Sequence, residues 1–426
     1  MRLKIQNLAK IEYADIKMNG ITVIAGKNNT GKSTIGKVVF ALFNSLSDIE
    51  GRLLRQKENL VYKQLRYVAE ENAGEDVEAG FYTIPSPSVL RSYARELCEH
   101  EDEQEQKEII RRLLKRISDF NPQALDDTAL RIYGDVSEIM RIPAEKLMKT
   151  VVSAYFSRIF HENICNVHKK EACAEIKALI KGKVTALAFS GTACKEIRQE
   201  IKILNRAFYL DNPFVLNRLN SGQPCDEMEK VLLHSLRQEA DAVERAVQYN
   251  ITSSRLENVL KYLNSVAGGR VYADESREYL FQEQGTDQPL SISNLSAGLK
   301  SFVIIKMLLE NHSLRERDVL ILDEPEIHLH PEWQMKYAEI IVLLQKEFDL
   351  TIILTTHSSH FLEALRLYAH KYGIKEKCNY YMTTQSSCGC VLEDMTEDVT
   401  QIYAQLIDPS IILNQMRYET EEAEDD

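Results

Sequence analysis

The chain has 426 residues, of which 44% are hydrophobic and 27% charged, so it is long enough for two or three lobes and has a globular composition. Its net charge of −12 argues against a general affinity for nucleic acid, although a local basic groove is compatible with it. No apolar run is long enough for a bilayer and no signal peptide precedes the first strand pattern, so we expect a cytoplasmic protein whose eight cysteines are free thiols, with no membrane partner.

The N-terminal segment predicts a strand, a glycine-bounded loop and a helix. Ile21–Ala25 is a short β-branched run typical of a buried strand, and the apolar residues of Ile35–Phe40 recur at helical spacing. Two further strands are expected before it, at Leu3–Leu8 and Glu12–Met18. The loop between strand and helix fits G-x-x-x-x-G-K-[ST], with Gly26, Lys27, Asn28, Asn29, Thr30, Gly31, Lys32, Ser33 and Thr34.

Such a loop binds the phosphates of a nucleotide. Backbone N–H groups and the positive end of the helix face the anion, which makes the segment an anion site. Lys32 adds a positive charge, and the Ser33 hydroxyl can hold Mg²⁺. The sequence therefore predicts nucleotide binding at residues 26–34.

The middle of the chain is predicted to be mostly helical. An amphipathic helix is expected at Arg91–Phe120, and its exposed Arg111, Arg112, Lys115 and Arg116 fit either a solvated face or a phosphate contact. Further helices are expected over most of residues 141–205 and at Met228–Val266, with strands at Ala207–Leu210 and Val271–Gln282.

The C-terminal third predicts a parallel sheet. Continuous apolar strands alternate with apolar or amphipathic helices, a pattern of sheets that are covered on both faces. The segments in chain order are helix Phe302–Leu309, strand Val319–Leu322, helix Trp333–Gln345 and strand Leu350–Leu354.

Polar residues follow both strands at the edge where parallel strands end. Asp323 is expected to hold Mg²⁺ beside the β- and γ-phosphates, and Glu324 to orient or deprotonate the attacking water. His357 follows the next strand, from where it could reach the γ-phosphate. Ser296-x-Gly298 precedes a helix and reads as an N-cap turn.

In this order the motifs resemble ABC-type ATPase heads, of the kind shared by SMC, RecF and overcoming-lysogenization-defect proteins. The resemblance covers residues 1–45 and 265–362. The sequences of three segments are similar to motifs of the stand-alone AAA-type ATPases of prokaryotic anti-phage and abortive-infection loci. These segments are Leu295–Ser301, Asp323–Gln334 and Thr356–Ser358.

The resemblance implies a fold, a reaction and an assembly. The fold is an α/β P-loop NTPase head with a mixed sheet, from residues 1–50 and 265–426, and the residues between, 51–264, partly complete the sheet and form a largely helical insertion. Two protomers would sandwich ATP, with Lys32 and Ser33 of one facing Ser296 and Gly298 of the other, as a homodimer or higher oligomer. The loop Glu326–Pro331 would touch the opposite protomer, and hydrolysis to ADP and phosphate would release the pair.

The chain departs from the family pattern in two places. The signature reads Ser-Ala-Gly rather than Ser-Gly-Gly, which keeps the second glycine. The glutamine that links the metal to the arm in the family has no clear counterpart, and Gln64 is a weak candidate.

A structural zinc site is not expected in the middle of the chain. The His and Cys residues that could bind zinc there are irregularly spaced, at His161, Cys165, His168 and Cys173.

The segment after His357 is too short for the nuclease that large overcoming-lysogenization-defect homologues carry. We therefore expect a separate effector protein, such as a nuclease. The acidic tail, residues 418–426, is expected to be disordered.

Three functions remain open at this point. The chain could be the ATP-hydrolysing sensor or motor of a prokaryotic defence system, or a RecF-like DNA repair or DNA-clamping ATPase. The long segment between loop and signature weakens a third hypothesis, the motor of a transporter.

Overall fold

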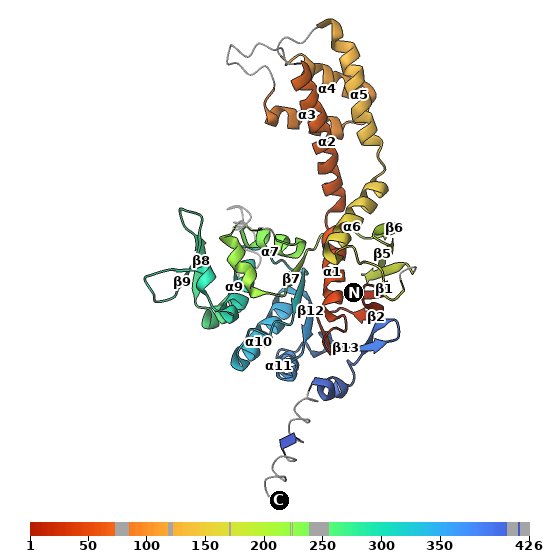
Figure 1. Ribbon diagram of the computed structural model, residues 1–426. Helices are drawn as coiled ribbons and strands as arrows, with labels where there is room; N and C mark the ends of the chain where they lie inside the picture. The colour runs from red at the N-terminus through yellow and green to blue at the C-terminus, as the bar shows by residue number, and fades with distance from the viewer. Residues whose placement is uncertain are drawn as a thin grey trace, which may run out of the picture. The chain divides into compact units, whose positions relative to one another are not determined.

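The computed structural model describes residues 1–72, 85–117, 122–169, 172–221, 223, 225–237, 255–406 and 416–417. It divides into two compact units, one of Met1–Ser47 with Val152–Asp426 and one of Asp48–Val151 (Figure 1). The acidic tail at 418–426 lies outside the described residues.

The first unit is built on an 11-stranded sheet of mixed direction, which confirms the predicted fold class. Its order is β6-β5-β4-β1-β2-β14-β13-β3-β12-β11-β7. The segment from β13 to β7 is parallel throughout, and β6-β5-β4-β1-β2 is antiparallel. The strands are β1 Arg2–Leu8, β2 Ile11–Lys17, β3 Ile21–Gly26, β4 Ala174–Ile180, β5 Lys183–Ser190, β6 Ala193–Gln199, β7 Ala207–Leu210, β11 Val319–Asp323, β12 Thr351–Thr356, β13 Cys378–Ser386 and β14 Gly389–Asp394.

Helices cover both faces of the parallel part. One apolar core packs α9 (Ala297–Glu310), α10 (Pro331–Phe348) and α11 (Ser359–Lys371) against one face. The other core packs α1 (Lys32–Leu46) and the part of α6 (Ala144–Phe160) from Val152 onward against the opposite face. Figure 1 shows α10 and α11 on one side of β12 and α1 on the other. All six residues of β3 are buried because both faces are covered.

The expectation that residues 141–205 are mostly helical is wrong for their second half. Three strands, β4 to β6, extend the sheet there. Along β4, residues alternate between buried and exposed up to its last position, the pattern of a strand with one covered face. Pairing with β1, far away in sequence, overrides the helical propensity of the alanines and lysines in this segment.

The second unit is helical, with α2 Ile49–Asn72, α3 Pro87–Glu99, α4 Glu103–Leu114 and α5 Leu125–Arg141. Its core is formed by apolar residues of all four helices. The single helix expected at Arg91–Phe120 is divided, because Asp102 caps α4 by accepting from two backbone N–H groups, those of Gln104 and Glu105. Arg111 pairs with Asp126 and Glu108, and Arg112 with Glu96.

Several further elements of the first unit precede the signature segment. They are the helical turn η3 Pro213–Leu219, α7 Glu227–Arg237, a helix over 255–266, and a three-stranded sheet of β8 Gly269–Ala273, β9 Tyr279–Glu283 and β10 Leu290–Ser291. The strand expected at Val271–Gln282 is thus a hairpin. The buried Lys306 ammonium ties α9 to this sheet by donating to the backbone oxygen of Gly269.

Candidate active site

The phosphate loop joins the buried end of β3 to the start of α1. Gly26 has φ 148° and Gly31 has φ 81°, values that side chains rarely tolerate. Gly31 is the N-cap of α1 and supplies no side-chain cap, so the first N–H groups of the helix stay available to an anion. Between the glycines, Lys27, Asn28 and Asn29 are exposed. The loop therefore has the backbone form that phosphate binding requires.

Lys32 lies inside this loop. Its side chain is buried, and Nζ donates to the backbone oxygens of Gly26 at 3.0 Å and Lys27 at 2.8 Å. Burial lowers the pKa of the ammonium, while the charges of Glu324 and Asp323 act to raise it. A phosphate in the loop would supply the missing counter-charge at close range.

Asp323, the last residue of β11, meets the phosphate loop. Its Oδ1 accepts from Ser33 Oγ at 3.1 Å and from the Thr355 hydroxyl, and its Oδ2 accepts from Tyr209 OH at 2.7 Å. The structure thus brings together the two predicted metal ligands. A hydroxyl and a carboxylate are hard oxygen donors, the type that Mg²⁺ prefers. The donor set fits the ion.

Glu324 and His357 form a close pair beside Asp323. His357 Nε2 lies 2.5 Å from Glu324 Oε1, and both side chains are about a third exposed or less. Nε2 has no hydrogen-bond partner within the described part of the chain, so the pair is a close contact. Glu324 has φ 51°, and its N–H donates to Thr355 Oγ1 at 2.9 Å, which fixes the turn after β11. The two side chains predicted to be catalytic, Glu324 and His357, therefore lie in direct contact.

The signature segment lies at the start of α9. Ser296 is the exposed N-cap, and its Oγ accepts from the Leu299 N–H at 3.3 Å. Gly298 is buried, and a Cβ there would lie 3.2 Å from His328 O and 3.3 Å from the Trp333 ring. No hydrogen bond among the described residues joins this turn to the phosphate loop of the same chain.

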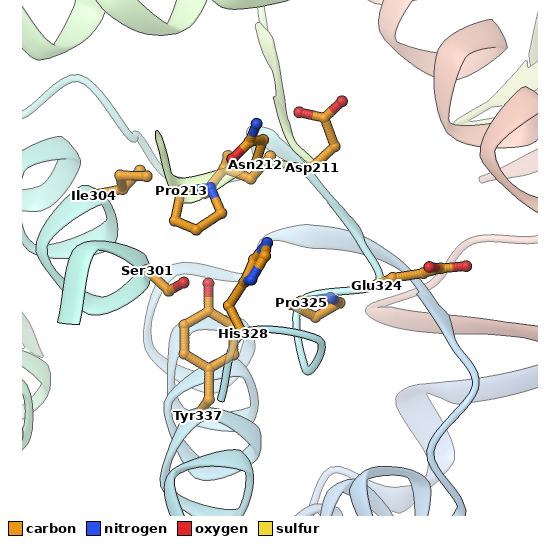
Figure 2. Close-up of a pocket in the computed structure, with 10 residues that line it drawn as sticks. Asp211, Asn212, Pro213, Ser301, Ile304, Glu324, Pro325, His328 and Tyr337 are labelled. Carbon is orange, nitrogen blue, oxygen red and sulfur yellow. The ribbon is translucent and has the colours of Figure 1, made fainter. Parts of the chain in front are cut away.

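A cavity of about 20 Å³, room for one water, separates α9 from the loop after β11. In Figure 2 the Ser301, His328 and Tyr337 side chains surround it, while the Glu324 carboxylate points away. The carboxylate is thus directed away from the centre of this cavity, although Glu324 is one of the residues that line it.

Several residues of the site were not predicted from the sequence. Tyr209 and Thr355 hold Asp323, and Lys10 Nζ donates to Asn29 Oδ1 in the phosphate loop. Thr383 Oγ1 lies 2.6 Å from Thr30 Oγ1. Thr355 stands next to Thr356-His357 and could have been suspected from that position. The other three depend on strand register, for which the sequence carries no local signal.

Other residues that the sequence suggested as functional do not belong to this site. Gln64 is in the second unit and donates to Asp135 Oδ2 at 2.6 Å. Within the described ranges no three His, Cys, Asp or Glu side chains could share a metal ion, and the cysteines are free. Among the described helices, none has both the length and the hydropathy that a membrane span requires.

Comparison with known proteins gives a family and several relatives. Residues 210–363 match the family described as "AAA domain, putative AbiEii toxin, Type IV TA system". The methionine import ATP-binding protein MetN of Protochlamydia amoebophila is 26% identical over 167 residues, which are 39% of this chain and 47% of the relative. The zinc import ATP-binding protein ZnuC of Rickettsia bellii is 30% identical over 112 residues, 26% of this chain and 46% of the relative.

The chain spans about half the length of these curated relatives. Among solved structures, an SMC head bound to the C-winged helix domain of ScpA has a TM-score of 0.44 and 10% identity, over 94% of this chain and 98% of that one. The SMC head of Thermotoga maritima has a TM-score of 0.39 and 11% identity, over 92% and 97%. The family match and the relatives show that the chain carries an AAA-type ATPase domain, similar to the ATP-binding proteins of import systems.

Proposed function

We propose that the chain binds ATP with Mg²⁺ and hydrolyses it to ADP and phosphate. The contact between Ser33 Oγ and Asp323 Oδ1 carries the proposal, because it joins the phosphate loop to the acidic end of β11. Two oxygen donors that meet beside a phosphate loop are the arrangement that a metal–nucleotide complex needs.

Each side chain then has a defined task. Lys32 and the N–H groups at the start of α1 bind the phosphates, and Ser33 and Asp323 would hold the metal. Mg²⁺, when bound, neutralises charge on the β- and γ-phosphate oxygens. Glu324 accepts the proton of the attacking water, and His357, 2.5 Å from its carboxylate, keeps that oxygen in place and faces the γ-phosphate.

We further propose that two copies close over ATP. The start of α9 at Ser296 is an exposed helix N-terminus that, among the described residues, has no hydrogen bond to its own phosphate loop, so it can serve the nucleotide of a second copy. Ile327, in the loop after β11, is 62% exposed, which fits a residue that a partner covers. The bound nucleotide would favour the pair, and its hydrolysis would release it.

The biological role that we favour is sensor or motor of a prokaryotic defence system with a separate effector. Its support is the family description, which names a putative AbiEii toxin. The RecF-like alternative gains no support from the helical unit, since Arg111 and Arg112 are paired with acidic side chains there. Binding of a fluorescent DNA duplex to the purified protein at physiological salt would reverse this preference.

Release of phosphate from ATP tests the reaction. Lys32→Ala should abolish turnover, whereas Lys37→Ala, which removes a charge from the same helix, should not. Glu324→Gln should slow turnover by about 10²–10⁴-fold and leave ATP affinity unchanged, because only the base is lost. Light scattering of Glu324→Gln with ATP should show a dimer. Unchanged turnover in Lys32→Ala would refute the site, and a monomer under all nucleotide conditions would refute the pairing.

A further inference from the structure

Glu326 is a buried carboxylate two residues beyond Glu324, and the reaction above does not use it. It is 4% exposed, so it is not available to an opposite protomer as predicted for the loop Glu326–Pro331. Within that loop, Ile327 and His328 are exposed instead. Burial raises the pKa of the Glu326 carboxyl above its usual value, which means that keeping it there has a cost. A buried carboxylate is retained at a cost where its hydrogen bonds have a use.

Those hydrogen bonds hold the segment after β12. Glu326 Oε1 accepts from the Thr356 hydroxyl and, at 2.8 Å, from the backbone N–H of His357. The backbone of His357 is thereby fixed to the segment that carries Glu324. The Glu326 Oε2 atom is buried and has no partner within the described residues, so both hydrogen bonds go to Oε1.

A second bridge connects the same two segments. Gln334, in the first turns of α10, donates to the backbone oxygens of Glu326 at 3.3 Å and Leu329 at 3.2 Å. Its Oε1 accepts from Ser358 Oγ at 3.2 Å, next to His357. The loop after β11 and the loop after β12 are therefore linked on both sides of the histidine, and among the described residues the Glu326 bond is the one that holds the backbone of His357 to the loop after β11.

We propose that Glu326 is a positioning residue, which fixes His357 against Glu324 by tying the loop after β12 to the loop after β11. The inference rests on the proposed hydrolysis, in which the His357 ring faces the γ-phosphate and the Glu324 carboxylate. Without the Glu326 acceptor, the backbone at His357 loses its anchor and the ring is free to move away. A displacement of about 1 Å at a reacting group lowers a rate by roughly 10²-fold.

A double-mutant cycle on the rate of ATP hydrolysis tests this role. Glu326→Ala should lower kcat by about 10- to 100-fold with KM near that of the wild type. Glu326→Gln keeps a carbonyl acceptor and should restore most of the rate. In a His357→Ala background, Glu326→Ala should have no further effect, because it acts through the ring that is missing.

Glu339 provides the matched control. It is also a buried carboxylate, 7% exposed, and accepts from Tyr262, Lys371 and Tyr372 away from the site. Glu339→Ala should change kcat by the same factor with and without His357. If Glu326→Ala behaves like Glu339→Ala, with equal loss in both backgrounds, its role is only structural and the proposal is wrong.

Hydrogen exchange at the His357 amide separates this proposal from the proposed function. The amide should exchange at least tenfold faster in Glu326→Ala and at the wild-type rate in Glu326→Gln and Glu339→Ala. Unchanged exchange in Glu326→Ala overturns the anchor whatever the activity. If the amide exchanges faster in Glu326→Ala but the wild-type chain hydrolyses no ATP, the anchor stands, while the proposed function and the catalytic role of the anchor are refuted.

Discussion

Gly26 offers a sharp test of how the phosphate loop is held. A Cβ at this position would lie 2.0 Å from Thr383 Oγ1 and 3.2 Å from Thr383 Cβ, and its φ of 148° is unfavourable for any side chain. Backbone strain of this kind costs about 1–3 kcal/mol, and overpacking a close contact adds about 1–3 kcal/mol. We therefore expect Gly26→Ala to lower the free energy of unfolding by roughly 2–6 kcal/mol.

The two contributions can be separated at Thr383. Thr383→Ala removes the clashing oxygen, whereas Thr383→Val puts a methyl group in its place, and both lose the contact with Thr30 Oγ1. Gly26→Ala should cost about 1–3 kcal/mol less in the Thr383→Ala background than in the wild type. In the Thr383→Val background it should cost as much as in the wild type.

Urea unfolding followed by tryptophan fluorescence is the assay. Trp333, the single tryptophan of the chain, lies on α10 in the first unit and therefore reports the unfolding of the unit that carries the site. A coupling between Gly26→Ala and Thr383→Ala below about 0.5 kcal/mol, the error of additivity at independent sites, would refute the steric reasoning. An equal relief by Thr383→Val would refute it as well.

Three further substitutions test other parts of the site. Ser296→Arg should leave ATP affinity of the single chain unchanged and abolish turnover, measured by analogue binding and phosphate release; equal loss of both would place Ser296 in its own chain's site. Tyr209→Phe removes the donor to Asp323 Oδ2 and should raise the Mg²⁺ concentration needed for half-maximal turnover by about 10- to 100-fold; an unchanged magnesium dependence would contradict this. Glu326→Gln should gain stability relative to the wild type as pH rises above about 4.5. The raised pKa of Glu326 means that the folded wild-type protein binds more protons than the unfolded chain, so the wild type loses stability as this carboxyl ionises. Unfolding curves followed by Trp333 fluorescence from pH 4.5 to 8 would contradict the raised pKa if the two proteins differed by a constant amount.

The parts of the fold that sequence reasoning predicted are those with strong local patterns. β3, β11 and β12 are largely continuous apolar runs and α10 has apolar residues at helical spacing, so each was predicted close to its observed bounds. The helical pattern at Ile35–Phe40 predicted the presence of α1 but only the middle of its length. The segment of β4 to β6 failed because helix-forming residues there adopt strands only through pairing with β1. β13 was not predicted at all, although it lies next to β3 in the sheet.

The residues of the site likewise fall into those that local motifs predict and those that they do not. Lys32, Ser33, Asp323 and Glu324 belong to contiguous motifs whose chemistry can be read locally, and the structure brings their side chains together. Their roles in ATP hydrolysis stay predictions. The support around them depends on distant register, as with Tyr209 against Asp323 and Thr383 against Thr30, and no local pattern in the sequence reveals such contacts.

The position of β3 has a consequence for how the protein is made. β3 lies between β12 and β13, so both neighbours of the strand that carries the phosphate loop are synthesised long after it. Thr30 is contacted by a residue 353 positions later, which at translation speeds of about 5–20 residues per second emerges roughly 20–70 s afterwards. The nascent polypeptide thus cannot complete the contacts around its phosphate loop until β13 has left the exit tunnel of the ribosome.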